Sequence, residues 1–272
     1  MLLRGIAGLS LLLSCVIFAL CDMALWLLPV LFIGFWLGLL VLAFVFLCVI
    51  CGAVDMEAPQ EEDSKFYRFF MYLYIEALIS LVGLKVEVSG LEKTPKDGRF
   101  LLVCNHQNEA DPGILLHYFK KSQLAFIGKK ETKNMFAVGK FMHKTLCQMI
   151  DRENDREALK TILKCIQMIK NDQVSVGVFP EGGIKVYGKL SRLRSGVFKI
   201  AQKADVPIVV CTLKGTDVLF HNIKRFKRSQ VILHLVDVIP AEELKGCTTV
   251  DIADRVYHMM LADLGDDYRI EE

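Results

Sequence analysis

The chain has 272 residues, of which 53% are hydrophobic, and its 33 basic and 31 acidic side chains give a formal net charge of +2. So apolar a composition excludes an ordinary soluble domain, and the length allows one domain plus a membrane segment. With so balanced a charge, we expect no nucleic-acid partner.

The first 54 residues are apolar almost throughout, with Arg4 and Asp22 as their only charged side chains. Within them, residues 3–21 and 29–53 each have the roughly 20 apolar residues that a membrane span needs. We therefore expect a transmembrane hairpin over residues 1–54, with Asp22 in its turn. A cleaved signal peptide is the alternative for the first stretch, but it would leave the second unexplained.

The charges that flank these stretches predict their orientation. Arg4 precedes the first stretch, Lys65 and Arg68 follow the second, and the short turn between them contains no Lys or Arg. Because cytoplasmic segments carry the excess of basic residues, both ends are expected in the cytoplasm. The sequence thus predicts a multi-pass protein of the cell membrane whose remaining domain lies on the cytoplasmic side.

The nine cysteines show no paired metal-ligand spacing, so we expect no metal site. The single C-x-x-C pair, Cys48 and Cys51, lies inside the second apolar stretch, where it does not indicate a redox motif. Reduced thiols fit a domain in the cytoplasm.

Residues 55–84 begin as an acidic linker and continue as an aromatic and aliphatic segment, 66–84, interrupted only by Arg68 and Glu76. This pattern suits a helix that lies in the bilayer interface, although a buried core helix gives nearly the same pattern. We favour the interfacial helix.

From residue 85 onward, short apolar runs alternate with segments of helical periodicity. In residues 155–171, apolar side chains recur at the three-to-four spacing of an amphipathic helix. This alternation predicts an α/β domain over residues 85–272, with a mostly parallel or mixed sheet flanked by helices. The expected strands are 85–88, 100–104, 124–127, 148–150, 174–179, 208–213 and 231–238.

The segment NHQNEADP, residues 105–112, follows a buried strand and starts a helix, with Asp111 in the N-cap position and Pro112 as the first helical residue. A capped turn with a backbone-bonded histidine is the structural interpretation. The functional interpretation is that Asp111 fixes the tautomer of His106, which acts as a general base. Open α/β sheets place ligands at such loops, where a strand's carboxyl end meets a helix N-terminus.

A second segment, FPEGG, places Glu181, Gly182 and Gly183 just after another buried strand. A glycine turn that closes a strand is the default interpretation, but its bare N–H groups can also face an anion or a developing oxyanion. Residues 185–203 then carry six basic side chains and no acidic one. Such a run is often a solvated face; beside the glycine turn it suggests a phosphate-bearing lipid.

Together these segments resemble the 1-acylglycerol-3-phosphate O-acyltransferase family of lysophospholipid acyltransferases, from about residue 66 to 216. NHQNEAD matches the family's His-x4-Asp catalytic block, and GKKE is followed by MIDR, whose Arg152 stands at a substrate-binding arginine. FPEGG is followed by LRSGVFKIA, similar to the family's basic-x-Gly-x-Phe segment, and VPIVV matches the strand that closes the acyl pocket.

The resemblance implies transfer of a fatty acyl chain from a thioester donor to the sn-2 hydroxyl of 1-acylglycerol-3-phosphate, which gives phosphatidic acid at the lipid bilayer. The donor would be acyl-CoA or acyl carrier protein, with no other cofactor. His106 and Asp111 would be catalytic. The candidate substrate-binding residues are Asn105, Lys129, Lys130, Arg152, Glu181, Gly182, Gly183 and Arg194.

One departure from the family leaves the acceptor open. The family's third block usually continues Glu-Gly-Thr-Arg, with the arginine on the acceptor phosphate, whereas Ile184 stands at that position here. Phosphate binding would then fall to the lysines at 129 and 130, to Arg152, or to Lys185 or Arg194. An acyltransferase for another lysophospholipid or lyso-aminolipid therefore remains an alternative, as does, in a different class, a non-catalytic lipid-binding membrane anchor.

Two further features have alternative interpretations. Cys104 lies two residues before His106 and could form a covalent intermediate, but a small buried strand residue is the simpler interpretation. The basic segment KRFKR, residues 224–228, is either an ordinary exposed loop or a docking site for an acidic acyl carrier protein.

Overall fold

The computed structural model describes residues 1–21, 24–151 and 154–270. Within these residues seven strands form one sheet, in the spatial order β1-β7-β6-β2-β5-β3-β4. Every neighbouring pair is parallel except β6 and β7, which run antiparallel, so the sheet is mixed. Each of the seven ranges predicted from the sequence contains a strand: β1 (Lys85–Ser89), β2 (Leu101–Cys104), β3 (Leu124–Lys129), β4 (Gln148–Ile150), β5 (Ser175–Val178), β6 (Ile208–Lys214) and β7 (Gln230–Ile239).

The inner strands are continuous apolar runs because both of their faces are covered. All four residues of β2 are 0% exposed, and every residue of β5 is also buried. Parallel strands that are covered on both sides need an apolar or small side chain at every position. β7 lies next to the edge strand β1, and its buried positions alternate with more exposed ones.

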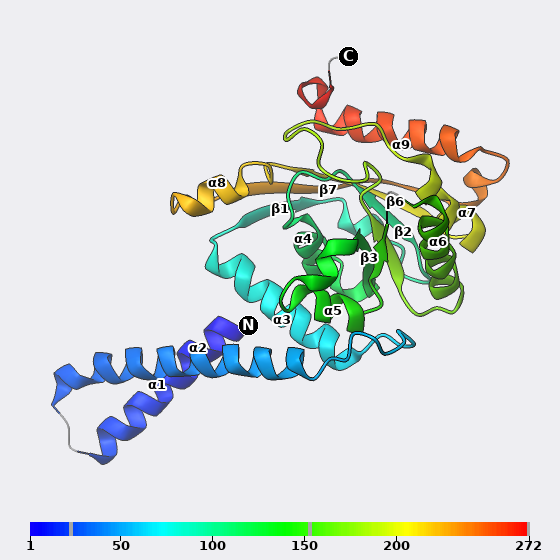
Figure 1. Ribbon diagram of the computed structural model, residues 1–272. Coiled ribbons are helices and arrows are strands. Elements are labelled where there is room, and N and C mark those ends of the chain that lie inside the picture. Colours follow the sequence, from blue (N-terminus) through cyan, green and yellow to red (C-terminus); the bar gives the residue numbers. More distant parts are fainter. Residues whose placement is uncertain (22–23, 152–153, 271–272) are drawn as a thin grey trace.

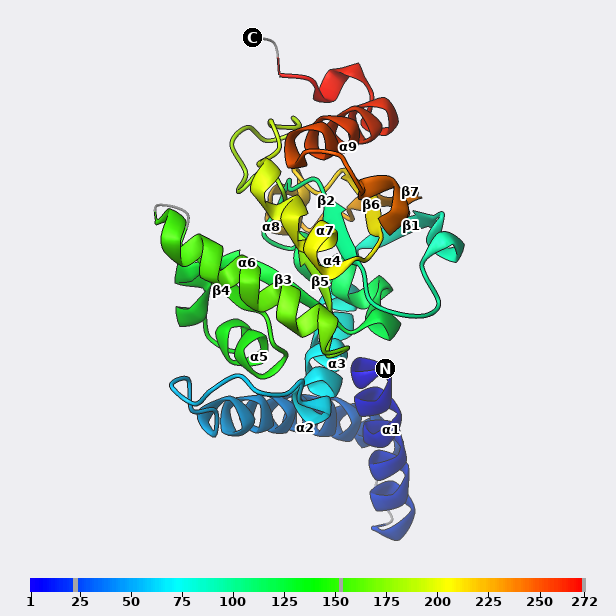
Figure 2. The same cartoon turned by 90° about the vertical axis from the view of Figure 1, so that its right-hand side faces the viewer.

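Helices lie on both faces of the sheet (Figures 1 and 2). α9 covers one face and begins with a capping box between Thr248 and Asp251. α4 lies across the sheet from α9, and α6, capped by Asn154, packs against β4 and β5. The helices of this domain are α4 (Asp111–Tyr118), α5 (Val138–Lys144), α6 (Asp155–Lys170), α7 (Lys199–Ala204), α8 (Leu219–Lys224) and α9 (Thr249–Leu264). Short 3₁₀ segments span Leu25–Leu27, Leu91–Lys93, Lys120–Ser122, Lys130–Asn134, Ser195–Phe198, Ala241–Leu244 and Asp266–Tyr268.

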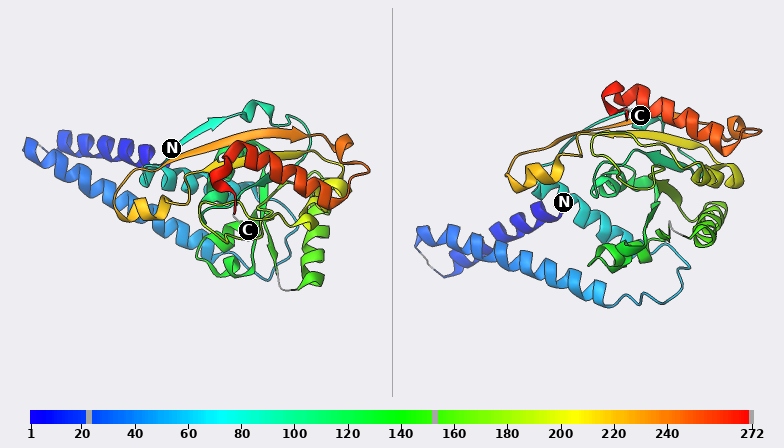
Figure 3. Two further views of the ribbon diagram at one scale, coloured as in Figure 1. Left: turned by 90° about the horizontal axis from the view of Figure 1, so that it is seen from above. Right: turned by 45° about the horizontal axis from the view of Figure 1, so that its top comes forward.

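Two N-terminal helices, α1 (Leu2–Leu20) and α2 (Leu28–Gly52), extend together from one side of the domain and cross each other (Figures 1 and 3). Both are long and apolar enough to cross a membrane, by length and composition. The helices expected from the sequence are thus present, while the number of membrane crossings stays a prediction. Asp22, expected in their turn, lies outside the described residues.

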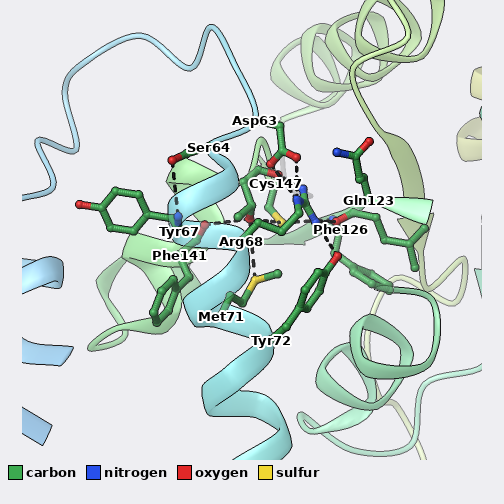
Figure 4. Close-up of polar contacts among 12 residues, drawn as sticks. Asp63, Ser64, Tyr67, Arg68, Met71, Tyr72, Gln123, Phe126, Phe141 and Cys147 are labelled. Atoms are coloured by element: carbon green, nitrogen blue, oxygen red, sulfur yellow. Dashed lines mark hydrogen bonds and ion pairs between the residues drawn. The ribbon is translucent and has the colours of Figure 1, made fainter. Parts of the chain in front are cut away.

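Helix α3 (Lys65–Leu81) joins this hairpin to the sheet (Figures 1 and 4). Its Arg68 is 4% exposed, forms an ion pair with Asp63 at 2.6 Å and donates to the carbonyl oxygens of Leu124 and Thr145 at 2.9 and 3.0 Å. On the hairpin side, the Tyr67 hydroxyl donates to a carbonyl oxygen of α2 at 3.0 Å. One face of α3 is therefore core and another contacts the hairpin. Exposed apolar side chains remain at Phe66, Phe69, Leu78 and Leu81.

Candidate active site

A polar loop follows β2 and leads into α4. In this loop His106 Nδ1 lies 3.0 Å from Asp111 Oδ2, and the same oxygen accepts hydrogen bonds from the backbone N–H groups of Gln107 (2.7 Å) and Asn108 (2.8 Å). The prediction that Asp111 is the N-cap is wrong by one residue, because Ala110 is the N-cap and Asp111 opens the helix. Its carboxylate points back toward the loop, where one oxygen accepts from the His106 ring and from two backbone N–H groups. Asp111 can therefore orient the histidine.

This geometry sets the role of each ring nitrogen of His106. Asp111 is 0% exposed, and a carboxylate acceptor at Nδ1 requires the hydrogen to be on that nitrogen. Nε2 is then left as the acceptor that can take a proton from a substrate hydroxyl. The buried carboxylate also stabilises the imidazolium that this transfer produces.

Aromatic rings form a wall beside the histidine. The His106 ring stacks on Phe179 with ring centroids 4.2 Å apart, and Phe179 stacks in turn on Phe126 at 5.5 Å. The His106 side chain is only 15% exposed. The sequence places Phe179 only at the end of a strand and does not predict its contact with the histidine.

Glu181 connects the histidine loop to the segment that follows the glycine turn. One of its carboxylate oxygens accepts from the His106 backbone N–H at 2.7 Å, and the other accepts from the Ser191 N–H at 2.7 Å. Burial raises the pKa of Glu181, and the two N–H groups partly offset this effect. Since both oxygens are occupied by backbone donors, the arrangement favours a positioning role for Glu181 over direct contact with substrate.

The glycine turn lies next to an arginine. Gly182 and Gly183 have φ angles of 77° and 135°, in the region that favours glycine. A Cβ atom on Gly182 would come within 2.5 Å of the Arg194 side-chain Nε, so the guanidinium stem lies directly over the turn. Among the ion pairs of the described residues, none includes Arg194. Arg194 thus lies near the histidine loop with no carboxylate partner among the described residues.

Comparison with known proteins gives this arrangement a family. Residues 85–214, which hold the His106–Asp111 pair and the glycine turn, match the model of the family described as Acyltransferase. These residues form a domain of the acyltransferase family. This membership confirms the resemblance seen in the sequence.

Related proteins carry names of the same kind. The chain is 33% identical over 178 residues to a "Probable 1-acyl-sn-glycerol-3-phosphate acyltransferase" of Mycoplasma pneumoniae, and the alignment covers 64% of each chain. It is 28% identical over 201 residues to the bovine (Bos taurus) "1-acyl-sn-glycerol-3-phosphate acyltransferase alpha", covering 74% of this chain and 68% of the relative. The chain therefore spans about two thirds of the length of these relatives.

The fold also matches a solved structure. The crystal structure of the 1-acyl-sn-glycerophosphate acyltransferase PlsC from Thermotoga maritima aligns with a TM-score of 0.63 at 22% identity, covering 80% of this chain and 86% of that one. At this identity the likeness concerns the fold, and it confirms the mixed α/β sheet predicted from the sequence.

Three other predicted substrate-binding residues are either paired with carboxylates or outside the described residues. Lys129 pairs with Glu131 at 3.6 Å and Lys130 pairs with Asp151 at 3.2 Å, both near the end of β3. Arg152 lies outside the described residues. The roles predicted for these three cations stay predictions.

Asn105 and Cys104 are buried where β2 ends. The Asn105 amide donates to the Leu213 carbonyl oxygen at 2.9 Å and accepts from the Leu213 N–H at 2.7 Å, so it ties β2 to β6. This pairing favours a structural role for Asn105. Burial raises the pKa of the Cys104 thiol well above its ordinary value, which keeps it protonated and disfavours a covalent route.

Two further hydrogen bonds, which the sequence did not predict, join the histidine loop to the segment after the glycine turn. The buried Gln107 side chain accepts from the Gly188 N–H at 2.6 Å and donates to the Lys189 carbonyl oxygen at 2.8 Å. The segment that follows the glycine turn is thereby fixed to the histidine loop. As for metals, no group of three or more His, Cys, Asp or Glu side chains that could hold an ion occurs in the described ranges.

Proposed function

We propose that this protein transfers a fatty acyl chain from a thioester donor to the sn-2 hydroxyl of 1-acylglycerol-3-phosphate and so makes phosphatidic acid at a membrane. The observation that carries the proposal is the 3.0 Å contact between His106 Nδ1 and the fully buried Asp111 carboxylate, in a loop at the carboxyl end of a central strand. Family membership and the relatives' names support the same reaction.

The residues assign a role to each proton in this reaction. Nε2 of His106 takes the hydroxyl proton while the hydroxyl oxygen attacks the thioester carbonyl carbon. When the tetrahedral intermediate collapses, the C–S bond breaks and the thiolate leaves with the proton returned by the imidazolium. The Gly182 N–H is used in the turn, where it donates to the Phe179 carbonyl oxygen, so we assign the oxyanion to the Gly183 N–H.

Recognition of the acceptor phosphate falls to Arg194 in this proposal. Ile184 removes the arginine that the family usually has, and Arg194 supplies a guanidinium over the same glycine turn. Arginine binds phosphate through paired charge-assisted hydrogen bonds. The exposed lysines at 129 and 130 remain secondary candidates, since each already faces a carboxylate.

The proposed setting is the cytoplasmic face of the cell membrane, with α1 and α2 as the anchor. Two apolar helices and the basic residues that flank them support this setting. The acyl donor is proposed to be acyl-CoA or acyl carrier protein, because either presents the thioester that the reaction needs.

Replacing the histidine tests the function directly. In His106→Ala, kcat with 1-acylglycerol-3-phosphate should fall by about a hundred- to ten-thousandfold, the usual contribution of a general base. Asp111→Asn should lose nearly as much. His221→Ala, an exposed histidine of α8, and Cys104→Ala serve as controls that retain turnover. Near-normal turnover in His106→Ala would contradict the mechanism, and no turnover in the wild type with any lysolipid would favour the non-catalytic anchor.

A competition between acceptors tests the substrate. With 1-acylglycerol-3-phosphate and a zwitterionic lysophospholipid both present, we expect the wild type to choose the phosphate monoester. Arg194→Gln should raise the KM for that acceptor strongly with little change in kcat, and Ile184→Arg should be tolerated or lower the KM. Preference for the zwitterionic lipid, with an unchanged KM in Arg194→Gln, would instead support the alternative acceptor.

A further inference from the structure

The turn between α8 and β7 combines four cations with a fully exposed aromatic ring. We call residues 224–228 the basic turn; it contains Lys224, Arg225, Phe226, Lys227 and Arg228. All five residues are exposed, and Phe226 is 99% exposed. None of the four cations takes part in an ion pair of the described residues.

The backbone presents Phe226 outward at a conformational cost. Its φ angle is 54°, in the left-handed region that non-glycine residues rarely adopt. The turn is closed by hydrogen bonds from the Phe226 N–H to Ile223 O at 3.0 Å and from the Lys227 N–H to Asn222 O at 2.9 Å. An apolar ring that is held in a strained turn and contacts almost nothing in the molecule indicates a contact with something outside it.

The position of the turn relative to the hairpin indicates what Phe226 contacts. α8 projects from the domain toward the side on which α1 and α2 extend, as the views in Figures 1 and 3 agree. The turn also adjoins the end of α3, where a Cβ atom on Gly83 would lie 3.5 Å from Arg228 Cγ. That end of α3 exposes Leu78 and Leu81, which are 60% and 72% exposed. The basic turn therefore lies beside exposed apolar side chains at the end of α3.

We propose that the basic turn is a second membrane contact, in which Phe226 enters the apolar side of a lipid surface while the four cations bind the phosphate groups of anionic lipids. Aromatic rings lie favourably at the boundary between headgroups and acyl chains, and basic side chains are attracted to anionic leaflets. An acidic acyl carrier protein would account for the charges, but not for an exposed phenylalanine on the hairpin side. The proposal rests on the proposed membrane anchoring and is independent of acyl transfer.

Tryptophan fluorescence in vesicles of defined lipid tests this contact. The chain has two tryptophans, Trp26 and Trp36, both in the hairpin region. We use the full chain with Trp26→Phe, Trp36→Phe and Phe226→Trp, reconstituted into phosphatidylcholine vesicles with or without phosphatidylglycerol. Bromine-labelled lipids quench only a tryptophan that reaches the acyl chains. The matched control is Val250→Trp in the same background, because Val250 is 55% exposed in the first turn of α9, away from α8 (Figure 1).

The reporter at position 226 should shift its emission to the blue and be quenched by brominated lipids, more strongly in vesicles that contain phosphatidylglycerol. Each of Arg225→Ser and Lys227→Ser should lower the ratio of inserted to free turn by roughly fivefold, the equivalent of about 1 kcal/mol for each cation near an anionic surface. The reporter at position 250 should stay water-like and unquenched.

Two outcomes would overturn the proposal. Emission from position 226 could stay water-like in every vesicle, or it could respond only to added acyl carrier protein, which would make the turn a protein docking site. The wild-type chain, measured in the same vesicles, reports through Trp26 and Trp36 whether the hairpin has inserted. If Trp26 and Trp36 of the wild type are quenched but the tryptophan at position 226 of the reporter variant is not, the second contact alone is contradicted. If neither protein is quenched, the proposed membrane anchoring is contradicted as well.

Discussion

At the scale of single residues, Glu181 is a buried carboxylate that we expect to position His106 without touching the substrate. Each of its oxygens accepts one backbone N–H, from His106 and from Ser191, at 2.7 Å. Glu181→Gln replaces one acceptor oxygen with an NH₂ donor, so one of these buried N–H groups loses its partner. We expect a loss of about 1–3 kcal/mol in the free energy of unfolding and a lower kcat. Glu92→Gln, in the 3₁₀ segment after β1, is the control and should change neither quantity. Thermal unfolding in detergent and a turnover assay measure both, and unchanged values for Glu181→Gln would contradict the positioning role.

The same residue makes a pH dependence testable. Burial raises the pKa of Glu181 above the ordinary value of 4.5, so the folded protein holds this proton at pH values where the unfolded chain has released it. The contribution of protonated Glu181 to stability is therefore fully present below 4.5 and is lost as the pH rises through the folded-state pKa. Relative to Glu181→Gln, the wild type should become more stable as the pH is lowered through this window. A stability difference that stays constant with pH would contradict the raised pKa.

At the scale of elements, the sheet was predictable because its inner strands bury both faces. Runs such as LLVC in β2 and SVGV in β5 must be apolar or small at every position, and each predicted range holds a strand. The contacts within the site were not predictable, because they join residues far apart in the sequence. Glu181 lies 75 positions from His106, and Lys189 lies 82 from Gln107. The His-x4-Asp spacing predicted the pair itself, since Asp111 opens the helix that directly follows the loop of His106.

Figure 4 shows the contacts by which Arg68 of helix α3 joins the domain, and we expect the placement of the helix to depend on them. Arg68→Met would leave Asp63, whose side chain is 8% exposed, without its partner, at a cost of about 3–5 kcal/mol. The double variant Arg68→Met with Asp63→Asn should recover part of this loss, because the uncompensated charge is then gone. The matched control is Lys65→Met, an exposed position in the same helix. Thermal unfolding followed by near-ultraviolet circular dichroism measures each variant, and a cost in Arg68→Met no larger than in the control would contradict the role of this ion pair.

At the scale of the whole molecule, the loop that carries His106, the basic turn and the hairpin lie toward one side. β6 ends at Lys214 and leads within a few residues into α8, which projects to the hairpin side (Figure 1). β2 runs parallel to β6, with Cys104 opposite Cys211. The loop that carries His106 therefore leaves the sheet at the same end of the strands as the segment that leads to α8. In the proposed reaction the acceptor and the product are both membrane lipids, and this arrangement would bring His106, the proposed general base, to the side from which those lipids arrive.

The depth to which the hairpin can enter a bilayer depends on how much of α2 packs against the domain. The Tyr74 hydroxyl of α3 donates to Ala43 O at 2.6 Å, and the Phe136 ring contacts Phe44 with centroids 6.4 Å apart. From residue 43 onward α2 thus lies beside the domain, and the part that projects beyond it is about 22 Å long at 1.5 Å per residue. The hydrocarbon core is about 30 Å thick. We therefore expect the hairpin to enter one leaflet, in contrast to the two full spans predicted from the sequence.

Labelling of the hairpin tip distinguishes these two topologies. Leu25, 73% exposed at the tip, is replaced by cysteine in a chain whose exposed thiols, Cys15, Cys21 and Cys247, are changed to serine. In sealed vesicles, a membrane-impermeant maleimide should fail to label Leu25→Cys from either side until detergent is added. Ser64→Cys, just before α3, should be labelled from the side of the domain and so shows that the reagent works. Labelling of the tip from the side opposite the domain would instead establish the two-span hairpin, because only a full crossing brings residue 25 to that surface.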